Sequence, residues 1–347
     1  MSAVTRQPLP SMALDRLGRP LRDLRVSVID ACNFRCPYCM PADKVADDHG
    51  LDAASRMSFD EIEMLVRGFV RLGVSKLRLT GGEPLLRKNL PQLIERLATI
   101  DGLDDIALTT NGSLLAKQAQ ALRDAGLHRL TISLDSIDAE RFHELSGGRG
   151  DLDSVLAGIA AAEAAGFDAI KFNCVVQRGV NETDAIELAE HFRDTRHVVR
   201  YIEYMDVGTC NGWRRERVVP SAELRDRIAA RWPLRALDAN YRGEVASRYA
   251  FVDGRGEIGF VSSVTEPFCG DCNRGRLSAD GKFYTCLFTA LGWDVLGCLR
   301  SGASENELLQ FIGRIWGGRI DRYSDERAEL RESGVARAKV EMSYIGG

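Results

Sequence analysis

Strand-like and helix-like segments alternate along residues 24 to 205, and this alternation constrains the fold more than any other feature of the sequence. Each β-branched or apolar run is followed by an amphipathic or alanine-rich run, which is typical of βα units on a parallel sheet. The predicted strands are Leu24–Asp30, Lys76–Gly82, Asp105–Asn111, Arg129–Asp135, Ala169–Val176 and Val198–Met205. The clearest predicted helices are Ser58–Leu72, Leu115–Ala125 and Leu152–Ala165. These units are too few for a closed eight-stranded barrel, so we predict an α/β fold, an open, partial (β/α)6 TIM-like barrel.

Several predicted strands carry polar side chains on one face. Lys76, Arg78 and Thr80 alternate with leucines, and Lys171 and Asn173 share a face further along. A parallel strand buried on both faces is apolar on both. For one residue, an exposed strand edge is explanation enough. For the whole set, polar side chains near the carboxyl ends of strands favour a barrel interior that binds a polar ligand.

The pattern changes after Gly212. A helix is predicted over Ser221–Arg231, and the pairs Asp253-Gly254 and Asp280-Gly281 each indicate a β-hairpin. We therefore predict a smaller C-terminal α+β domain. The predicted divisions are a flexible tail over 1–13, a barrel domain over 14–235 and a C-terminal domain over 236–347.

Composition excludes several classes of protein. Lysine and arginine number 46 against 50 acidic residues, a net charge of -4, which argues against a protein built mainly to hold nucleic acid. No apolar run approaches the ~20 residues that span a bilayer, and the N-terminal residues lack the apolar core of a signal peptide. We expect a cytoplasmic protein with no membrane partner. Of nine cysteines, most fall into two tight groups, and in a reducing compartment such groups favour metal or cluster binding over disulfides.

The first cysteine group is Cys32, Cys36 and Cys39, directly after the first predicted strand. A structural zinc site needs four ligands, usually in two pairs. Three thiolates on a 4Fe–4S cluster instead leave one iron without a protein ligand, and that iron can bind a small molecule. A zinc site completed by a distant histidine or cysteine is the alternative.

The second group is Cys269 and Cys272, with Cys286 further on. The hairpin predicted at Asp280-Gly281 would carry Cys286 back towards the other two. The spacing again predicts a 4Fe–4S cluster with an open iron, and a zinc site that uses Cys298 is the alternative.

The first group and the later Gly81-Gly82-Glu83-Pro84 segment resemble the signature of the radical S-adenosylmethionine (SAM) superfamily. The resemblance implies that SAM binds the open iron and is cleaved to a 5′-deoxyadenosyl radical. It implies that Gly82 and Glu83 lie in the stretch that holds the SAM amino group and that Tyr38 neighbours the adenine. Ser133 and Met205 are the further SAM contacts that we expect.

Nearly the whole chain resembles the molybdenum-cofactor biosynthesis protein A family, the GTP 3′,8-cyclases. The motifs that carry this resemblance are Leu24-Arg25-Val-Ser, Thr109-Thr110-Asn111-Gly112, Lys171-Phe-Asn173, the Arg200–Gly208 stretch, the second cysteine group with Arg274 and Arg276, and the C-terminal Gly346-Gly347. The family reaction is implied: conversion of GTP to (8S)-3′,8-cyclo-7,8-dihydro-GTP, the first step of molybdenum cofactor biosynthesis. The implied cofactors are two 4Fe–4S clusters and SAM.

The resemblance also assigns residues. Catalytic roles would fall to Cys32, Cys36, Cys39, Arg274, Arg276, Gly346 and Gly347. GTP contacts would be Arg25, Arg78, Thr109, Lys171, Arg200, Arg274 and Arg276, because a triphosphate needs fixed cations. A predicted strand over Val340–Ile345 would lead into the Gly-Gly tail. Implied partners are an external electron donor and the next pathway enzyme, cyclic pyranopterin monophosphate synthase, and a homodimer stays open.

Two other functions are consistent with parts of the pattern. A peptide-modifying radical SAM enzyme also carries an extra cluster, although such enzymes usually bring more cysteines in the C-terminal domain. A non-catalytic electron-transfer or zinc-binding module would need neither the Gly-Gly-Glu-Pro segment nor a barrel, so the first 210 residues count against it.

Overall fold

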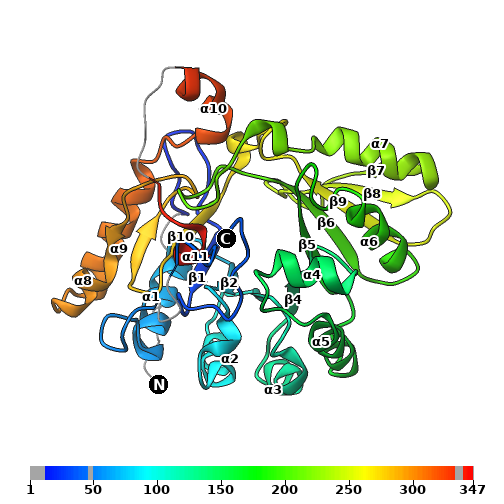
Figure 1. Ribbon diagram of the computed structural model, residues 1–347. Coiled ribbons are helices and arrows are strands. Elements are labelled where there is room, and N and C mark those ends of the chain that lie inside the picture. The colour runs from blue at the N-terminus through cyan, green and yellow to red at the C-terminus, as the bar shows by residue number, and fades with distance from the viewer. Residues whose placement is uncertain (1–11, 46–49, 333–338, 347) are drawn as a thin grey trace.

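The computed structural model describes residues 12–45, 50–332 and 339–346 (Figure 1). The strands are β1 Asp23–Ser27, β2 Lys76–Thr80, β3 Asp105–Thr110, β4 Arg129–Ser133, β5 Lys171–Val176, β6 Val198–Glu203, β7 Leu234–Leu237, β8 Ser247–Phe251, β9 Glu257–Val261, β10 Arg274–Leu277, β11 Lys282–Tyr284 and β12 Trp293–Asp294. The α-helices are α1 Phe59–Arg71, α2 Leu90–Ala98, α3 Ala119–Asp124, α4 Ala139–Leu145, α5 Leu152–Ala164, α6 Asp184–Phe192, α7 Ser221–Arg231, α8 Val295–Arg300, α9 Glu305–Gly317, α10 Tyr323–Glu332 and α11 Met342–Ile345. Short 3₁₀ turns are η1 Pro84–Leu86, η2 Leu115–Lys117, η3 Arg215–Arg217 and η4 Cys269–Asp271.

All the strands join one 12-stranded sheet in the order β12-β11-β10-β1-β2-β3-β4-β5-β6-β9-β8-β7. The strands β1 to β6 run parallel in sequence order, as βα units require. Two C-terminal strands extend this barrel in parallel, β10 beside β1 and β9 beside β6. The sheet ends β12 and β7 are not neighbours in this order, so the described barrel is open.

Alternation along the strands separates an apolar outer layer from a polar interior. In β1, Leu24 and Val26 are fully buried, while Arg25 between them points to the opposite face. The helices α1 to α6 cover the outer face of the sheet (Figure 1). The helix α1 begins at a capping box, in which Ser58 accepts from the Glu61 backbone N–H and Glu61 accepts from that of Ser58. The hydrophobic core therefore lies outside the barrel, and the interior is left for polar side chains.

These strands confirm the predicted partial barrel. All six predicted strands are present within a few residues, and Leu115–Ala125 divides into η2 and α3. Both predicted hairpins form, β8 with β9 and β10 with β11. Strands from both sides of residue 235 share the same sheet. The division into two domains at this residue stays a prediction. In the described part of the chain, no helix is both long and apolar enough to cross a bilayer.

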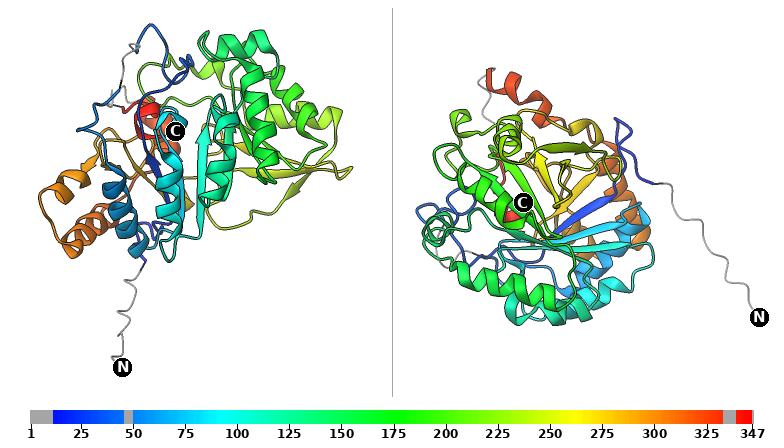
Figure 2. Two further views of the ribbon diagram at one scale, coloured as in Figure 1. Left: turned by 90° about the horizontal axis from the view of Figure 1, so that it is seen from below. Right: turned by 90° about the vertical axis from the view of Figure 1, so that its right-hand side faces the viewer.

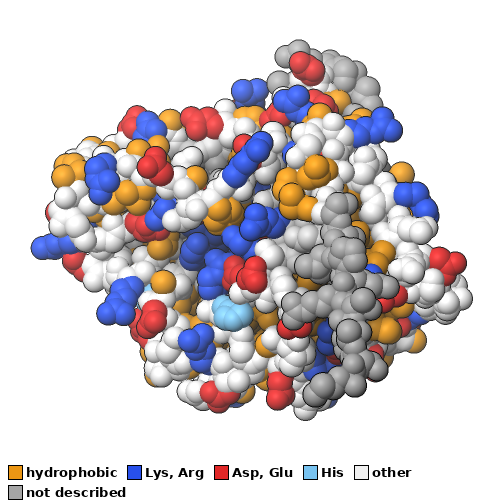
Figure 3. Space-filling view, turned by 180° about the vertical axis from the view of Figure 1, so that it is seen from behind, with side chains coloured by type: hydrophobic (Ala, Val, Ile, Leu, Met, Phe, Trp, Pro, Cys, Tyr) orange, Lys and Arg blue, Asp and Glu red, His pale blue; other side chains and the backbone are white. Residues whose placement is uncertain are grey.

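The C-terminal segment enters the curve of the sheet. The helix α11 contacts β1, and Figure 2 shows this red segment on the concave side of the barrel. On the face opposite to that of Figure 1, Lys and Arg side chains gather in a central hollow (Figure 3). The architecture thus places the helix α11 on the concave side of the barrel.

Candidate functional site

The first cysteine group lies in the loop after β1. The backbone turns so that the Cys39 N–H donates to the Cys36 carbonyl at 2.9 Å and the Phe34 N–H donates to Cys32 Sγ at 3.3 Å. Burial raises the pKa of Cys36, and the nearby Cys39, Asp135 and Cys32 raise it further. Burial likewise raises the pKa of Cys32 to about 11. A bound metal cation would favour the thiolate form of such buried cysteines.

The described side chains form no ready-made site for a single metal ion. Among the described residues, no group of three or more His, Cys, Asp or Glu side chains is arranged to hold one metal ion. In a 4Fe–4S cluster each thiolate binds a different iron, so its ligands stand further apart than those of one zinc ion. The zinc alternatives for both cysteine groups therefore find no support in this part of the chain.

The Gly81-Gly82-Glu83 turn packs directly on the first cysteine loop. The Gly82 N–H donates to the Ile29 carbonyl at 2.8 Å, and the Glu83 N–H donates to the Ala31 carbonyl at 2.9 Å. A Cβ atom on Gly81 would overlap the Ile29 carbonyl, and one on Gly82 would overlap that of Ala31. Only glycine permits this approach.

The side chain of Glu83 is buried and joins the turn to β3. It accepts from the Leu85 N–H at 2.9 Å, the Thr110 hydroxyl at 2.7 Å and the Asn111 N–H at 2.7 Å. Burial outweighs these bonds and raises its pKa to about 7. Glu83 therefore fixes the turn beside Cys32, and its role towards SAM stays a proposal.

The other predicted SAM contacts are Tyr38, Ser133 and Met205, and they do not all lie at the first cysteine loop. The Tyr38 hydroxyl donates to Asp135 Oδ2 at 2.7 Å, and the Val175 N–H donates to Oδ1 at 2.8 Å. Burial raises the pKa of Asp135 to about 6. Ser133 ends β4, whereas Met205 follows β6 and packs beside Val207 and Phe288 near the second cysteine group. The Tyr38 side chain is thus fixed by Asp135 beside the first cysteine group. Met205 lies closer to the second cysteine group.

Cys269 and Cys272 of the second group lie at η4, and Cys286 follows β11. The β10–β11 hairpin leads the chain back from the first two cysteines to the third. Cys272 Sγ accepts from Arg274 Nη2 at 3.3 Å and from Arg319 Nη2 at 3.2 Å. Burial alone would raise the pKa of Cys272, but these two guanidinium groups lower it to about 6. Burial raises the pKa of Cys286 to about 11. Cys298 packs against the hydrophobic core from α8.

Arginines line the barrel interior between the two cysteine groups. Arg25 on β1 is in register with Arg276 on β10 and Arg78 on β2, so the three occupy neighbouring positions on one face. Burial lowers the pKa of Arg25, and the like charges of Arg276 and Arg78 lower it further. The pKa of Arg276 falls in the same way, through burial and Arg274.

These cations form no ion pair with a described carboxylate, although Asp23 lies near enough to raise the pKa of Arg25 and Arg274. The Nε atoms of Arg25, Arg200 and Arg276 and the Nη1 atom of Arg274 are buried without a hydrogen-bond partner among the described residues. Buried donors are normally satisfied, and clustered like charges repel each other. The arrangement therefore fits a bound polyanion that would satisfy both requirements.

The remaining predicted GTP contacts lie on β3, β5 and β6 of the same sheet. Arg78 Nη1 donates to the hydroxyls of Thr109 and Thr131, each at 3.0 Å. Arg200 Nη2 donates to Asn173 Oδ1 at 2.7 Å. Lys171 is half-buried on β5, and burial followed by the charge of Arg200 lowers its pKa to about 8.

We predict that GTP affinity falls as the pH rises above 8 because of Lys171. In the free protein its pKa is about 8, and a bound triphosphate raises the pKa of a nearby amine. Above pH 8, GTP binding therefore requires proton uptake, and the affinity declines by up to roughly tenfold per pH unit until the bound-state pKa is reached. Anaerobic calorimetry between pH 7 and 9.5 measures this slope. The Lys171→Arg variant should lose it because arginine stays protonated, and an unchanged slope in that variant would refute the assignment.

The C-terminal tail lies against the barrel as a helix, and the predicted strand over Val340–Ile345 is wrong. Tertiary contacts override the β-branched pattern: Glu341 accepts from the Thr209 N–H and hydroxyl, and Tyr344 donates to Asp280. Ile345 is fully buried. Gly346 has a φ of 69°, and a Cβ there would overlap Thr80 Oγ1 on β2. Gly347 lies outside the described residues.

Sequence reasoning missed three buried residues beneath the second cysteine group: Asp15, Arg19 and Arg319. Asp15 and Arg19 flank a tight turn at Gly18, where φ is 73°, and the backbone pairs Leu14 with Pro20. An acid and an arginine four residues apart around a glycine are a weak signal of this turn. Nothing local in the sequence links them to Arg319, some 300 residues later.

Comparisons with known proteins agree with this geometry. Residues 26–192 match the model of the Radical SAM superfamily, and residues 197–325 match that of Molybdenum Cofactor Synthesis C. The GTP 3′,8-cyclase of Xanthomonas campestris pv. campestris (strain B100) is 64% identical over 333 residues, 96% of this chain and 97% of that protein. The GTP 3′,8-cyclases of Acidothermus cellulolyticus and Staphylococcus carnosus are 50% and 46% identical, and each comparison covers 96% of this chain and 98% of the relative.

Solved structures show the same fold at low identity. Streptococcus suis SuiB bound to S-adenosylmethionine is 15% identical, with a TM-score of 0.59, over 84% of this chain and 68% of that one. SuiB bound to the precursor peptide SuiA gives a TM-score of 0.60 at 15% identity, over 87% and 65% of the two chains. This likeness concerns the fold alone.

Proposed function

The chain belongs to the GTP 3′,8-cyclase family of the radical SAM superfamily, and on that premise we propose how its residues carry the reaction. The protein converts GTP to (8S)-3′,8-cyclo-7,8-dihydro-GTP, the first step of molybdenum cofactor biosynthesis. Its cofactors are SAM and two 4Fe–4S clusters. Among the alternatives, the relatives favour this family over a peptide-modifying enzyme or a non-catalytic module.

The first cysteine group would hold the cluster that binds SAM. When bound, that cluster and SAM would supply the radical chemistry of the reaction. The protein's part is orientation: the Gly81-Gly82 turn lies against the cysteine loop, and Asp135 holds the Tyr38 side chain in place. Cys32, Cys36 and Cys39 would each bind one iron and leave the fourth to SAM.

The observation that carries the GTP assignment is the row of buried arginines on one face of β1, β2 and β10. Arg25, Arg78 and Arg276 stand in register across β1, β2 and β10, and a triphosphate would satisfy the buried Nε donors of Arg25 and Arg276. Arg274 adjoins Cys272, so a nucleotide on these arginines would bring its purine towards the second cluster. Thr109, Lys171 and Arg200 would complete the contacts, with Gly346 closing the site from the tail.

Anaerobic incubation of the reconstituted protein with GTP, SAM and a strong reductant tests this function. Mass spectrometry should identify the cyclised dihydro-GTP together with 5′-deoxyadenosine, and neither should form when SAM is omitted. ATP serves as the matched control nucleotide. Cleavage of SAM with GTP recovered unchanged would refute the proposal.

The partners belong to the same proposal. We infer an external electron donor, transfer of the product to cyclic pyranopterin monophosphate synthase, and a cytoplasmic location. The acidic net charge of -4 supports the absence of nucleic acid as a partner, and the described residues contain no membrane-spanning helix. A homodimer stays open, and light scattering under anaerobic conditions measures it.

A further inference from the structure

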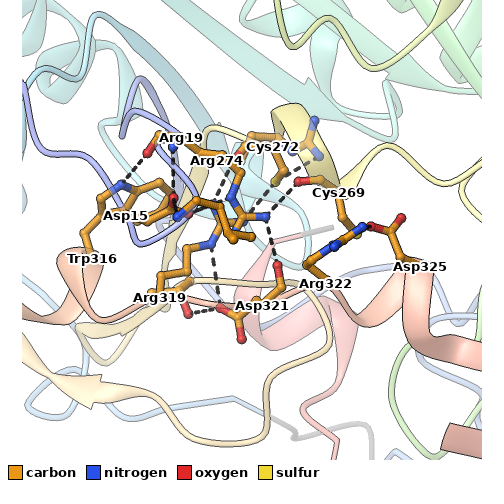
Figure 4. A network of polar contacts seen from close by, with 12 residues as sticks. Asp15, Arg19, Cys269, Cys272, Arg274, Trp316, Arg319, Asp321, Arg322 and Asp325 are labelled. Carbon is orange, nitrogen blue, oxygen red and sulfur yellow. Dashed lines mark hydrogen bonds and ion pairs between the residues drawn. The ribbon is translucent and has the colours of Figure 1, made fainter. Parts of the chain in front are cut away.

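A buried polar network lies beneath the second cysteine group, and Arg319 is its centre (Figure 4). Arg319 follows α9, and its side chain is 1% exposed. Its Nη2 atom donates to Cys272 Sγ at 3.2 Å, and its Nη1 atom donates to the Cys272 carbonyl at 2.7 Å. One guanidinium group therefore holds both the sulfur and the backbone of the same cysteine.

Fixed partners determine where this guanidinium points. Asp15, also fully buried, lies 3.2 Å from Arg319 Nη1 and 2.6 Å from Arg19 Nε. The indole ring of Trp316 lies 4.5 Å from the Arg319 guanidinium carbon, and its N–H donates to the Arg19 carbonyl. Asp321 lies 3.6 Å from Arg319 Nε, beyond hydrogen-bond distance, and accepts from Thr285 instead. Such a guanidinium loses little freedom when it binds the sulfur.

We propose that Arg319 is a positioning residue of the second cluster, which orients Cys272 and stabilises the reduced form of the cluster through its hydrogen bond to the sulfur. This inference rests on the proposed function, which places the second cluster on Cys269, Cys272 and Cys286. Reduction adds one negative charge to a cluster, and hydrogen bonds to its sulfurs favour the reduced state. Arg319 would therefore raise the midpoint potential of this cluster.

Replacing Arg319 tests the effect on the second cluster without removing a proposed nucleotide contact. Arg274 also donates to Cys272 Sγ, at 3.3 Å, but it is a proposed nucleotide contact, so its replacement would change two things at once. The described side-chain contacts of Arg319 are with Asp15, Trp316, Asp321 and Cys272. If Arg319 is replaced, Asp15 keeps Arg19 and two backbone N–H donors, so no buried carboxylate is stranded.

The test is a potentiometric titration of the two-cluster holoenzyme, followed by electron paramagnetic resonance without GTP. In Arg319→Met the ratio of reduced to oxidised second cluster, at a fixed potential near its midpoint, should fall about tenfold, which is a shift of about 59 mV for one electron. The Arg319→Lys variant keeps the charge but has a single donor position, so its shift should be smaller. The signal of the second cluster is assigned from the protein in which Cys32, Cys36 and Cys39 are alanine.

The matched control is Arg19→Met, which removes an equally buried guanidinium from the same carboxylate. Arg19 donates to the carbonyls of Cys269 and Asp321 and has no described contact with a sulfur, so this variant should lose thermal stability and keep the midpoint potential. An unchanged potential in Arg319→Met, or an equal shift in Arg19→Met, would leave Arg319 a purely structural residue. If Arg319→Met does not load a second cluster, Arg319→Lys decides: a wild-type potential in that variant overturns the proposal.

Iron and sulfide analysis of the wild-type protein comes first. One cluster per chain would contradict the proposed function itself. Two clusters with an unshifted potential in the Arg319 variants would contradict only the role of Arg319.

Discussion

Replacing Cys32, Cys36 and Cys39 together with alanine should remove about half of the iron and abolish SAM cleavage. Each of these thiols would bind one iron, and three alanines leave that loop without a ligand. The second cysteine group lies on other elements, η4 and the segment after β11, so its cluster should remain. Iron and sulfide content, together with 5′-deoxyadenosine formation in excess reductant, measures both outcomes. SAM cleavage that persisted in this variant would refute the assignment.

Cys210 provides the sharpest control for this experiment. It lies near enough to Cys39 to raise the pKa of that thiol, after burial and the charges of Cys32 and Glu341. A fourth cysteine on the cluster would occupy the iron that SAM needs. Cys210→Ala should therefore keep the wild-type iron content and SAM cleavage, and a loss of iron would identify Cys210 as a ligand.

The barrel could be predicted from the sequence because its signals are local. Each strand from β1 to β6 has its own apolar run, and the polar residues Arg25, Arg78 and Lys171 fall at alternating positions that face inward. The cysteine groups are equally local, since their spacing lies within one loop or one hairpin. The resemblance to a known family then assigned roles that spacing alone leaves open.

What escaped prediction depends on contacts between distant segments. The strands β9 and β10 pair with β6 and β1 and extend the barrel sheet at both ends, and no local pattern in the sequence indicated these pairings. The tail is a helix because Thr209 and Asp280 bind it from elsewhere in the chain. No periodicity in a sequence encodes such pairings, since each requires the rest of the fold to be in place.

The second cysteine group differs from the first in its electrostatics. Burial raises the pKa of each thiol in the first group and of Cys269 and Cys286 in the second, whereas Arg274 and Arg319 lower that of Cys272. The second cluster would thus sit among cations, next to the arginines proposed to hold GTP. Loss of the second cluster should therefore impair the reaction of GTP and leave SAM cleavage possible.

Replacing Cys269, Cys272 and Cys286 together with alanine should abolish cyclisation and retain SAM cleavage uncoupled from it. The first cysteine loop, with its Gly81-Gly82 turn, makes its described hydrogen bonds without these three residues, so SAM can still be bound and reduced there. Without the second cluster the purine would lose the group that it is proposed to approach, so GTP would be held out of position for ring closure. Mass spectrometry should find 5′-deoxyadenosine but no cyclised dihydro-GTP. Cys298→Ala is the matched control, because this cysteine packs against the core from α8, and it should cyclise GTP normally. Normal cyclisation in the triple variant would show that the second cluster does not serve the substrate.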